Sequence, residues 1–409
     1  MAKQNKTPLG IYVHIPFCRS KCEYCDFYSL GGGKEKGLMD GYLQAVQAHI
    51  KEAGALAPGY VVDTVYFGGG TPTFFGAEGL VQILGAIRRR FEVDSEAEIT
   101  FEANPDSVTP RGLRRLKAEG FNRVSLGVQS DDDALLKKLG RPHNYRQVEE
   151  AVDQIREEGF HNLSLDLMYG LPGQTRAAWE TTLRHVLELK PEHMSCYGLK
   201  VEEGTPLWRY REYADLPDDD TQADMYLSAV EILREKGYQQ YEISNFARRG
   251  LRSRHNLKYW TGGEYLGFGP AASSDFAGKR FTIAPDLHGY IDGIRSGGAV
   301  LSECQQVPAR DRAGEYLMLR LRTTRGIEEW EYRSAYFMDF APLERRLEEF
   351  QAQGWAEKTA EGRWRFTPKG FLVSNQLIGD LLDRQEQAQL SDVLVRAREH
   401  YAARGPEEG

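Results

Sequence analysis

The chain has 409 residues, 41% of them hydrophobic and 27% charged, which predicts a globular protein with one large domain and a smaller one. Its 52 Lys and Arg against 60 Asp and Glu give a formal net charge of -8, which argues against non-specific binding to nucleic acid or to an anionic membrane. The first residues lack a signal-peptide pattern and no segment offers the ~20 apolar residues of a membrane span, so we expect a cytoplasmic protein.

Six short stretches rich in β-branched and aromatic residues alternate with longer amphipathic ones. The predicted strands are residues 10–15, 61–67, 97–103, 122–128, 163–169 and 193–199. The predicted helices include the regions of Leu80, Ile83, Leu84 and Ile87 and of Leu113 and Leu116, and residues 146–158, 176–189 and 221–236. These βα units predict an α/β fold and favour a partial (β/α)6 TIM-like barrel, in which functional side chains gather where the strands end.

The alternation stops after Ser244. Residues 254–276 are rich in Gly and aromatic residues, and we expect an ordered loop packed on the barrel. Helical patterns at residues 310–322, 342–353 and 370–381 accompany two short β-like stretches around Gly362. They predict a small α+β, winged-helix-like domain, and because it lacks a basic face we favour a structural role over nucleic-acid binding.

These patterns divide the chain into four expected parts. Residues 1–245 would form the barrel and residues 246–305 a Gly- and aromatic-rich extension. Residues 306–400 would form the C-terminal accessory domain, and residues 401–409 a disordered tail.

A cysteine cluster directly follows the first predicted strand. Cys18, Cys22 and Cys25 form the pattern C-x3-C-x2-C, whereas the other two of the five cysteines lie far away. A disulfide framework would spread its cysteines, and three soft thiolates in one loop suit three corners of a [4Fe–4S] cluster. The alternative is a structural zinc with His14 as fourth ligand, which we favour less because His14 would lie on the strand itself.

Three protein ligands leave one iron of the cluster open. The amino and carboxylate groups of S-adenosylmethionine can chelate such an iron, and an electron from the reduced cluster can then cleave the sulfonium. A run of glycines, Gly68, Gly69 and Gly70, with Thr71 and Pro72 after it, follows the second predicted strand. Backbone without side chains can approach an amino-acid moiety closely, although a structural turn would explain the run taken alone.

The motif Y-V-H-I-P-F-C-x3-C-x-Y-C-x-F (12–27) with G-G-G-T-P resembles the coproporphyrinogen III dehydrogenase (HemN) family of radical SAM proteins. The resemblance extends from Tyr12 to about Asn375. Further similar pieces are E-A-N-P (102–105), S-L-G-V-Q-S (125–130), G-R-P-H (140–143), D-L-M-Y-G-L-P-G-Q-T (166–175), H-N-L-K-Y-W (255–260) and Y-L-G-F-G-P (265–270). This resemblance implies the radical SAM fold, a [4Fe–4S] cluster and bound S-adenosylmethionine.

The resemblance also implies roles for individual residues. Tyr12 would line the S-adenosylmethionine site, and Gly69, Gly70 and Thr71 would hold the methionine amino group. Arg141 would pair with the carboxylate, because a guanidinium matches a carboxylate in two parallel hydrogen bonds.

Three more polar residues stand at or near the ends of predicted strands. The resemblance gives Glu102, Gln129 and Asp166 contacts with the methionine amine, the ribose or the carboxylate. A carboxylate taken singly is more often part of a surface ion pair, but several polar groups at barrel strand ends favour a binding site.

Two features separate the chain from the dehydrogenases of this family. The dehydrogenases of this family have the pattern C-x3-C-x2-C-x-C, whereas this chain has Phe27 at the last position. In addition, only 17 residues precede Cys18. Both features argue against decarboxylation of coproporphyrinogen. In both features the chain resembles instead the HemW branch of the family, in which C-D-F follows the motif and H-N-x-x-Y-W appears downstream. Members of this branch are described as haem chaperones that hand haem to respiratory enzymes.

For haem, the sequence offers His255 as an axial imidazole beside the aromatic faces of Tyr259 and Trp260. The alternative is that His255 caps a loop through hydrogen bonds and that the aromatic residues belong to the core. Relatives often carry Ala-His-Ser after Y-L-G-x-G, where this chain reads A-S-S (272–274), so a second imidazole is missing.

We therefore expect a haem chaperone that holds the cluster, S-adenosylmethionine and haem, and delivers haem to respiratory haem proteins. Contact with a membrane would come through those acceptors. The first rival is an oxygen-independent coproporphyrinogen III dehydrogenase or another tetrapyrrole-modifying enzyme. The second is a protein whose cluster is structural or redox-sensing and which binds no haem. The residues leave open whether S-adenosylmethionine is turned over.

Overall fold

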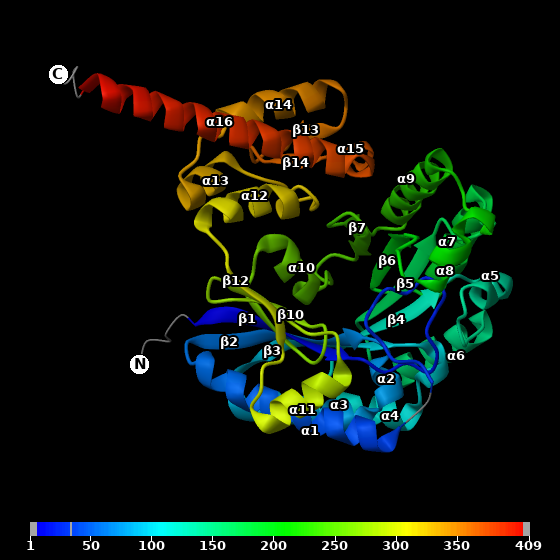
Figure 1. Ribbon diagram of the computed structural model, residues 1–409. Coiled ribbons are helices and arrows are strands. Elements are labelled where there is room, and N and C mark those ends of the chain that lie inside the picture. The colour runs from blue at the N-terminus through cyan, green and yellow to red at the C-terminus, as the bar shows by residue number, and fades with distance from the viewer. Residues whose placement is uncertain (1–5, 33–34, 404–409) are drawn as a thin grey trace. The chain divides into compact units, whose positions relative to one another are not determined.

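The computed structural model describes residues 6–32 and 35–403, and the six predicted strands form one parallel array within them. The strands are β1 (Thr7–Ile15), β2 (Tyr60–Gly69), β3 (Val93–Ala103), β4 (Arg123–Gln129), β5 (Leu163–Tyr169) and β6 (His193–Gly198). Each is hydrogen-bonded in parallel to the next. The helices that connect them include α1 (Lys36–Ala53), α3 (Ala77–Arg90), α4 (Pro110–Ala118), α6 (Tyr145–Glu157) and α7 (Arg176–Leu187) (Figure 1).

The array does not close on itself. It belongs to a 12-stranded sheet with the order β12-β11-β10-β9-β1-β2-β3-β4-β5-β6-β8-β7. β1 pairs with β9 (Tyr265–Phe268) and β6 pairs with β8 (Asn245–Ala247), instead of the two ends pairing with each other. This arrangement confirms the predicted partial (β/α)6 TIM-like barrel. Further elements in this part are the long helix α9 (Asp219–Glu235) and the shorter α2 (Pro72–Phe75), α5 (Asp133–Lys138), α8 (Pro206–Tyr210) and β7 (Gln239–Gln240).

Side-chain caps mark where several of these helices begin. Thr109 accepts from the N–H of Gly112 at the start of α4, and Thr175 accepts from the N–H of Ala178 at the start of α7. Asn144 forms a reciprocal capping box with residue 147 at the start of α6. Each cap satisfies backbone donors that a helix leaves unpaired and contributes about 1 kcal/mol.

Side chains of the six parallel strands alternate between two faces, as strand geometry requires. The outer face is apolar and fully buried, and it includes Ile11, Val13, Val65, Phe67, Phe101, Val124, Leu126, Leu165 and Leu167. These side chains form one continuous core with apolar residues of the surrounding helices, and full burial of each contributes about 1.5–3 kcal/mol. Burial of the outer face turns the alternate, more polar positions toward the inside of the barrel.

The region after Ser244 corrects one expectation, because residues 254–276 are not a loop. They form α10 (Arg254–Thr261), β9 and β10 (Ser273–Phe276), and α11 (Leu287–Ser296), β11 (Lys279–Ile283) and β12 (Leu301–Gln306) follow. β9 and β10 have four residues each, too few for a period of two to show in the sequence, and pairing with β1 fixes the position of β9. Gly267 permits the close packing, because a Cβ there would lie 2.3 Å from the carbonyl oxygen of Ser273.

The chain divides into two units. The first comprises Met1–Gln240, Ser244–Tyr259 and Gly263–Gln306, and the second comprises Tyr241–Ile243, Trp260–Gly262 and Val307–Gly409. The second unit contains α12 (Ala309–Arg320), α13 (Glu329–Tyr336), α14 (Ala341–Ala352), β13 (Ala356–Lys358), β14 (Trp364–Phe366), α15 (Pro368–Leu372) and α16 (Ser374–Ala403). β13 and β14 form an antiparallel hairpin, which agrees with the small α+β, winged-helix-like domain expected there.

The predicted helix at residues 370–381 is divided in the structure. Thr367 caps α15, whose last residue is Leu372, and Val373 leaves helical geometry with φ -112° and ψ 18°. α16 then begins at Ser374 and continues well past the predicted end. The predicted tail starts inside α16, and its residues 404–409 lie outside the described part of the chain.

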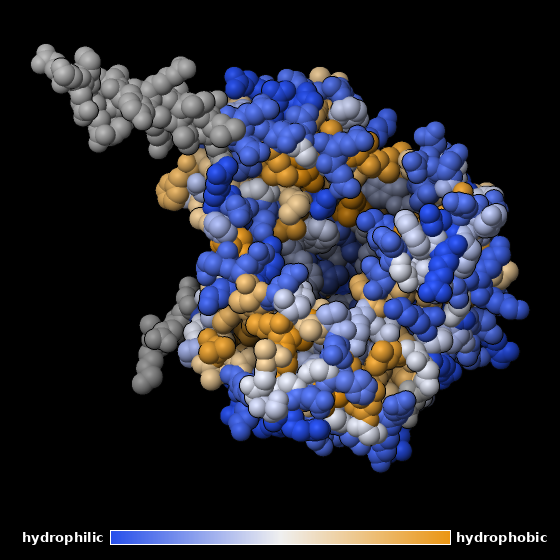
Figure 2. All heavy atoms as spheres, in the orientation of Figure 1, coloured by the Kyte–Doolittle hydropathy of each residue, from blue (hydrophilic) through white to orange (hydrophobic). Residues whose placement is uncertain are grey.

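In residues 6–32 and 35–403, no helix combines the length and the apolar character needed to cross a membrane. Polar side chains cover most of the face seen in Figure 2, with smaller apolar patches between them.

Candidate functional site

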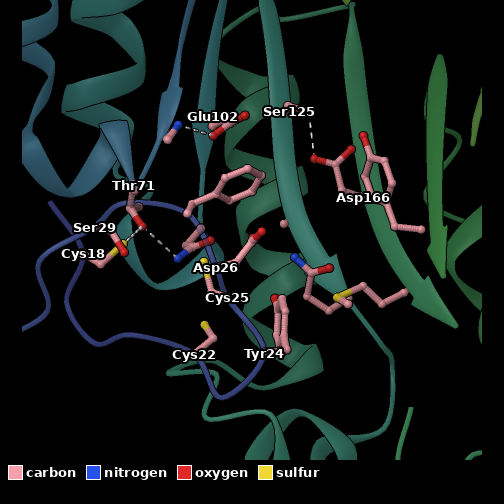
Figure 3. Close-up of a pocket in the computed structure, with 18 of the residues that line it drawn as sticks. Cys18, Cys22, Tyr24, Cys25, Asp26, Ser29, Thr71, Glu102, Ser125 and Asp166 are labelled. Carbon is pink, nitrogen blue, oxygen red and sulfur yellow. Dashed lines mark hydrogen bonds between the residues drawn. The ribbon is translucent and has the colours of Figure 1, made fainter. Parts of the chain in front are cut away.

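A pocket of about 490 Å³ opens at the carboxyl ends of the parallel strands. Its lining includes Cys18, Cys22, Cys25, Gly69, Gly70, Thr71, Glu102, Gln129, Arg141 and Asp166. Figure 3 labels the three cysteines, Thr71, Glu102 and Asp166 among them. The structure thus brings ten of the twelve predicted site residues to one pocket, and Tyr12 and His255 lie outside its lining. Both the position and the volume are typical of a small-molecule site in a barrel.

The cysteine loop after β1 is held by backbone hydrogen bonds. The N–H of Cys18 donates to the carbonyl oxygen of Leu30, 3.0 Å away. At the middle of the loop, Glu23 donates to the carbonyl oxygen of Leu139 at 3.1 Å and accepts from the N–H of Leu207 at 2.8 Å. The turn after α5 and the start of α8 therefore fix the path of the loop along the pocket.

The three thiols lie along one wall of the pocket, with Cys18 beside Thr71 and Cys25 farther along the loop (Figure 3). The sulfur of Cys18 is 3.5 Å from the hydroxyl oxygen of Thr71, and that of Cys22 accepts from Nη1 of Arg141 at 3.5 Å. Burial raises the pKa of Cys25 to about 11 and also raises the pKa of Cys18. Binding of iron would therefore displace protons from these thiols.

The donor set suits a cluster better than a single ion. Among the described residues, no three His, Cys, Asp or Glu side chains converge closely enough to hold one metal ion. Thiolates that bind different irons of a cluster need not meet at one point. His14 is 4% exposed, and its ring nitrogens lie 3.1 Å from the Tyr12 hydroxyl and 2.7 Å from the Tyr28 carbonyl oxygen. This geometry argues against the zinc alternative.

Gly69 and Gly70 form a wall that side chains could not occupy. Gly69 has φ 107°, and a Cβ there would lie 2.5 Å from the ring of His14. A Cβ at Gly70 would lie 2.7 Å from the carbonyl oxygen of Phe17. The N–H of Thr71 donates to that same carbonyl oxygen at 2.8 Å, so the glycine wall and the start of the cysteine loop are joined.

Glu102, on β3, is fixed by donors at both carboxylate oxygens. The Tyr66 hydroxyl donates to Oε1 at 2.8 Å, and the N–H of Gly69 donates to Oε2 at 3.1 Å. Burial raises the pKa of Glu102 to about 7, the charge of Asp166 adds to the rise, and the bond from Tyr66 opposes it. A carboxyl group with this pKa can change between a hydrogen-bond donor and an anion near neutral pH.

Asp166, on β5, is surrounded by hydroxyl donors. Its Oδ2 accepts from Ser125 on β4 at 2.8 Å. Its Oδ1 accepts from Ser164 at 2.9 Å and from Ser195 on β6 at 2.6 Å. These bonds link three neighbouring strands across the floor of the pocket.

Arg141 follows α5, and its side chain extends to the cysteine loop. Its Nη2 donates to the side-chain oxygen of Asn104 at 2.7 Å and to the carbonyl oxygen of Gly127 at 2.9 Å. Asn104 in turn donates to the hydroxyl of Thr71 at 3.2 Å. The buried Nε of Arg141 has no hydrogen-bond partner among the described residues, so this donor fits an anionic group of a ligand.

Gln129 ends β4 with φ 66°, a value that a residue with a side chain rarely adopts. The register between β4 and β5 shifts between Gly127 and Gln129, and this shift brings Gln129 into the pocket wall. Such backbone strain gathers at binding sites. Tyr12, by contrast, lies behind the wall, with its ring stacked on Tyr66 at a centroid distance of 6.2 Å.

His255, on α10, is buried away from the pocket lining. It is 1% exposed, and its ring nitrogens lie 2.9 Å from the hydroxyls of Thr64 and Tyr259. Burial lowers the pKa of this imidazole to about 3, with a further contribution from Lys258. The haem contact of His255 stays a prediction, and it would require the ring to leave at least one of these bonds. Its neighbour Asn256 does line the pocket.

Sequence reasoning missed several residues of the pocket wall. They are Tyr66, Asn104, Arg123, Ser125, Met168, Ser195, Tyr197 and Lys200. Met168 lies two residues after Asp166 on β5, and Asn104 lies two residues after Glu102, so the period of two was a signal that could have found these two.

A family model for the radical SAM superfamily matches residues 12–186. Among curated proteins, the chain is 35% identical to the haem chaperone HemW of Bacillus subtilis, over 91% of this chain and 98% of that protein. It is 34% identical to HemW of Escherichia coli, over 91% of this chain and 97% of that protein.

The fold also resembles a solved enzyme structure. The coproporphyrinogen III oxidase HemN of Escherichia coli, described as a radical SAM enzyme, superposes with a TM-score of 0.81 and 25% sequence identity. The match covers 93% of this chain and 91% of that one.

Proposed function

Because the chain belongs to the HemW family within the radical SAM superfamily, we propose that it is a haem chaperone that delivers haem to respiratory haem proteins. The observation that carries this proposal is the match over 91% of the chain to curated haem chaperones. The reducing cytoplasm, where we place the protein, suits thiols that must stay reduced until they bind iron.

We propose that Cys18, Cys22 and Cys25 hold a [4Fe–4S] cluster with one iron left for S-adenosylmethionine. When both are bound, they can supply one-electron cleavage of the sulfonium. Their position in one pocket and the contact between Cys22 and Arg141 support this assignment.

The remaining predicted residues would bind S-adenosylmethionine beside the cluster. Arg141 would take the carboxylate, because its Nε is a buried donor without a partner among the described residues. Glu102 would accept from the N–H groups of the methionine amine, since its carboxylate is already oriented by Tyr66 and Gly69. Asp166 and Gln129 line the same wall and would accept from the ribose hydroxyls or the amine.

The test is an anaerobic titration of the cluster-reconstituted protein with haemin, followed by Soret absorbance and then by transfer to a haem-free acceptor protein. We expect stoichiometric binding and transfer of the haem. Absence of a Soret shift would contradict the proposal and favour the rival without haem.

A second arm addresses the decarboxylase alternative. The same protein is reduced, given S-adenosylmethionine and incubated with coproporphyrinogen III. We expect no decarboxylated product, because Phe27 stands where the dehydrogenases of this family have a fourth cysteine. Product formation together with failure to bind haem would favour the dehydrogenase.

A further inference from the structure

Two aromatic side chains at the pocket are exposed to solvent. Phe27 is 63% exposed and Tyr197 is 40% exposed, and both line the same pocket as the three cysteines. Most large aromatic residues of this unit are buried in its core. Exposed rings that border a ligand pocket mark a surface that an apolar partner covers.

The position of each ring follows from the backbone. Phe27 comes two residues after Cys25, so it belongs to the same loop as the three cysteines. On β6, Tyr197 lies two residues after Ser195, which bonds to Asp166 inside the pocket, so both β6 side chains face inward. Phe27 and Tyr197 therefore approach one opening, from the cysteine loop and from the last parallel strand.

Met168 completes this apolar border. It pairs in register with Tyr197 on the neighbouring strand and is 7% exposed in the pocket wall. Strand partners in register project to the same side of a sheet. We call Phe27 and Tyr197 the aromatic rim, and Met168 packs beside them in the pocket wall. Glu102 and Asp166 line the same pocket, and we call these two carboxyl side chains its polar floor.

Cationic side chains stand beside the rim. Lys21 and Lys200 are exposed and belong to the pocket lining. Lys200 pairs with Glu202 at 3.6 Å, but its side chain is 85% exposed. An exposed pair of this kind is weak, so Lys200 can exchange Glu202 for a carboxylate of a ligand.

We infer that the aromatic rim is where the porphyrin ring of haem docks. This inference rests on the proposed haem-chaperone function and adds its binding surface. Haem is a flat apolar ring with two propionate carboxylates, which matches aromatic faces flanked by lysines. None of the described residues that line the pocket is a histidine, so the contacts offered here are to the ring and the propionates. The polar floor stays available to S-adenosylmethionine.

The experiment compares the dissociation constants of haemin and of metal-free protoporphyrin for the cluster-reconstituted protein. Phe27→Ala and Tyr197→Ala should each weaken binding of both porphyrins about tenfold, because the loss falls on ring contacts rather than on iron ligation. Lys200→Glu should weaken binding about threefold at low salt, with a smaller effect at high salt. Cluster content and S-adenosylmethionine binding report whether each variant is folded.

Matched controls come from exposed aromatic residues outside the pocket lining. Phe337 is 91% exposed on the second unit and Tyr213 is 87% exposed on the first. Phe337→Ala and Tyr213→Ala should leave both dissociation constants unchanged. An equal loss in these controls would mean that haemin adsorbs to exposed rings in general, which would overturn the inference.

The failure of this inference and the failure of the proposed function give different results. If the wild-type protein binds haemin and the rim variants bind it equally well, haem docks elsewhere and the rim assignment is wrong. If the wild-type protein binds no haemin, the proposed function itself fails. A loss confined to haemin, with metal-free protoporphyrin unaffected, would also overturn ring docking in favour of iron ligation.

Discussion

The side-chain oxygen of Asn104 accepts a hydrogen bond of 2.7 Å from Nη2 of Arg141. Asn104 also donates to Thr71, whose hydroxyl lies 3.5 Å from the sulfur of Cys18. Since Arg141 contacts Cys22 as well, a chain of polar contacts links two of the three cysteines of the loop through one amide.

We therefore propose that Asn104 positions both sides of the proposed S-adenosylmethionine site. Asn104→Ala should leave the cluster in place and weaken S-adenosylmethionine binding about 3- to 10-fold, since each neutral hydrogen bond contributes about 1 kcal/mol. Equilibrium binding to the reconstituted protein measures the change, and the electron paramagnetic resonance signal of the reduced cluster should lose part of its response to S-adenosylmethionine. Unchanged affinity and an unchanged response would remove Asn104 from this role.

Arg141→Lys should weaken S-adenosylmethionine binding roughly 10- to 100-fold without loss of iron. A lysine keeps the charge but cannot form the paired hydrogen bonds of a guanidinium with a carboxylate, and charge-assisted bonds contribute about 1.5–3 kcal/mol. Calorimetric titration measures the affinity, with Arg146→Lys on the exposed surface of α6 as control. If both variants bind like the wild type, Arg141 is not the carboxylate partner.

Cys22→Ser should abolish the cluster and its broad visible absorbance, because one of three protein ligands is lost. Cys304→Ser is the matched control, since Cys304 is an exposed residue of β12 outside the pocket. Iron and sulfide are counted after anaerobic reconstitution. Full retention of both in Cys22→Ser would refute the ligand assignment.

Glu102 should make the stability of the cofactor-free protein depend on pH. Its pKa is about 7 in the folded protein against a usual value of 4.5, so the folded state holds the proton more tightly than the unfolded chain. The stability from this group is therefore fully present below pH 4.5 and is lost as the pH rises to about 7. Urea unfolding at pH 5 and pH 8 should show a larger fall in the wild type than in Glu102→Gln. Equal falls would contradict the raised pKa.

His255→Ala should lower the free energy of unfolding by about 1–3 kcal/mol, because Thr64 and Tyr259 lose a buried hydrogen-bond partner. Thr64→Val removes one of these bonds and keeps the imidazole. A haemin titration of both variants separates the structural role from the predicted haem contact. Weaker haem binding in His255→Ala alone supports the contact, whereas equal binding in both assigns His255 to the fold.

Much of the fold and the pocket could be predicted because their signals lie in contiguous sequence. Each parallel strand reads as a short apolar stretch, and Cys18, Cys22 and Cys25 share one loop. The strand ends carry Glu102 and Asp166, and a barrel gathers its strand ends at one edge. These local signals led to the same pocket that the structure contains.

The parts that escaped prediction depend on contacts between distant residues. The bond between Thr64 and His255 joins residues 191 positions apart, and no local pattern announces it. β9 was expected to be loop because pairing with β1, rather than its own composition, makes it a strand. Arg123 is 1% exposed and looks in the sequence like a surface charge next to Asn122, so its place in the pocket wall was missed.

Because β1 and β6 do not pair with each other, a ligand in the pocket can connect the two ends of the barrel. The cysteine loop follows β1 and carries Cys25, and the opposite end of the array, β6, carries Tyr197, yet both residues face one pocket. A molecule that touches both would clamp the two ends together, as interstrand hydrogen bonds do in a closed barrel. The ligand-bound and ligand-free forms of the protein would then differ in the rigidity of the barrel. A partner protein could distinguish the two forms by this rigidity without contacting the ligand.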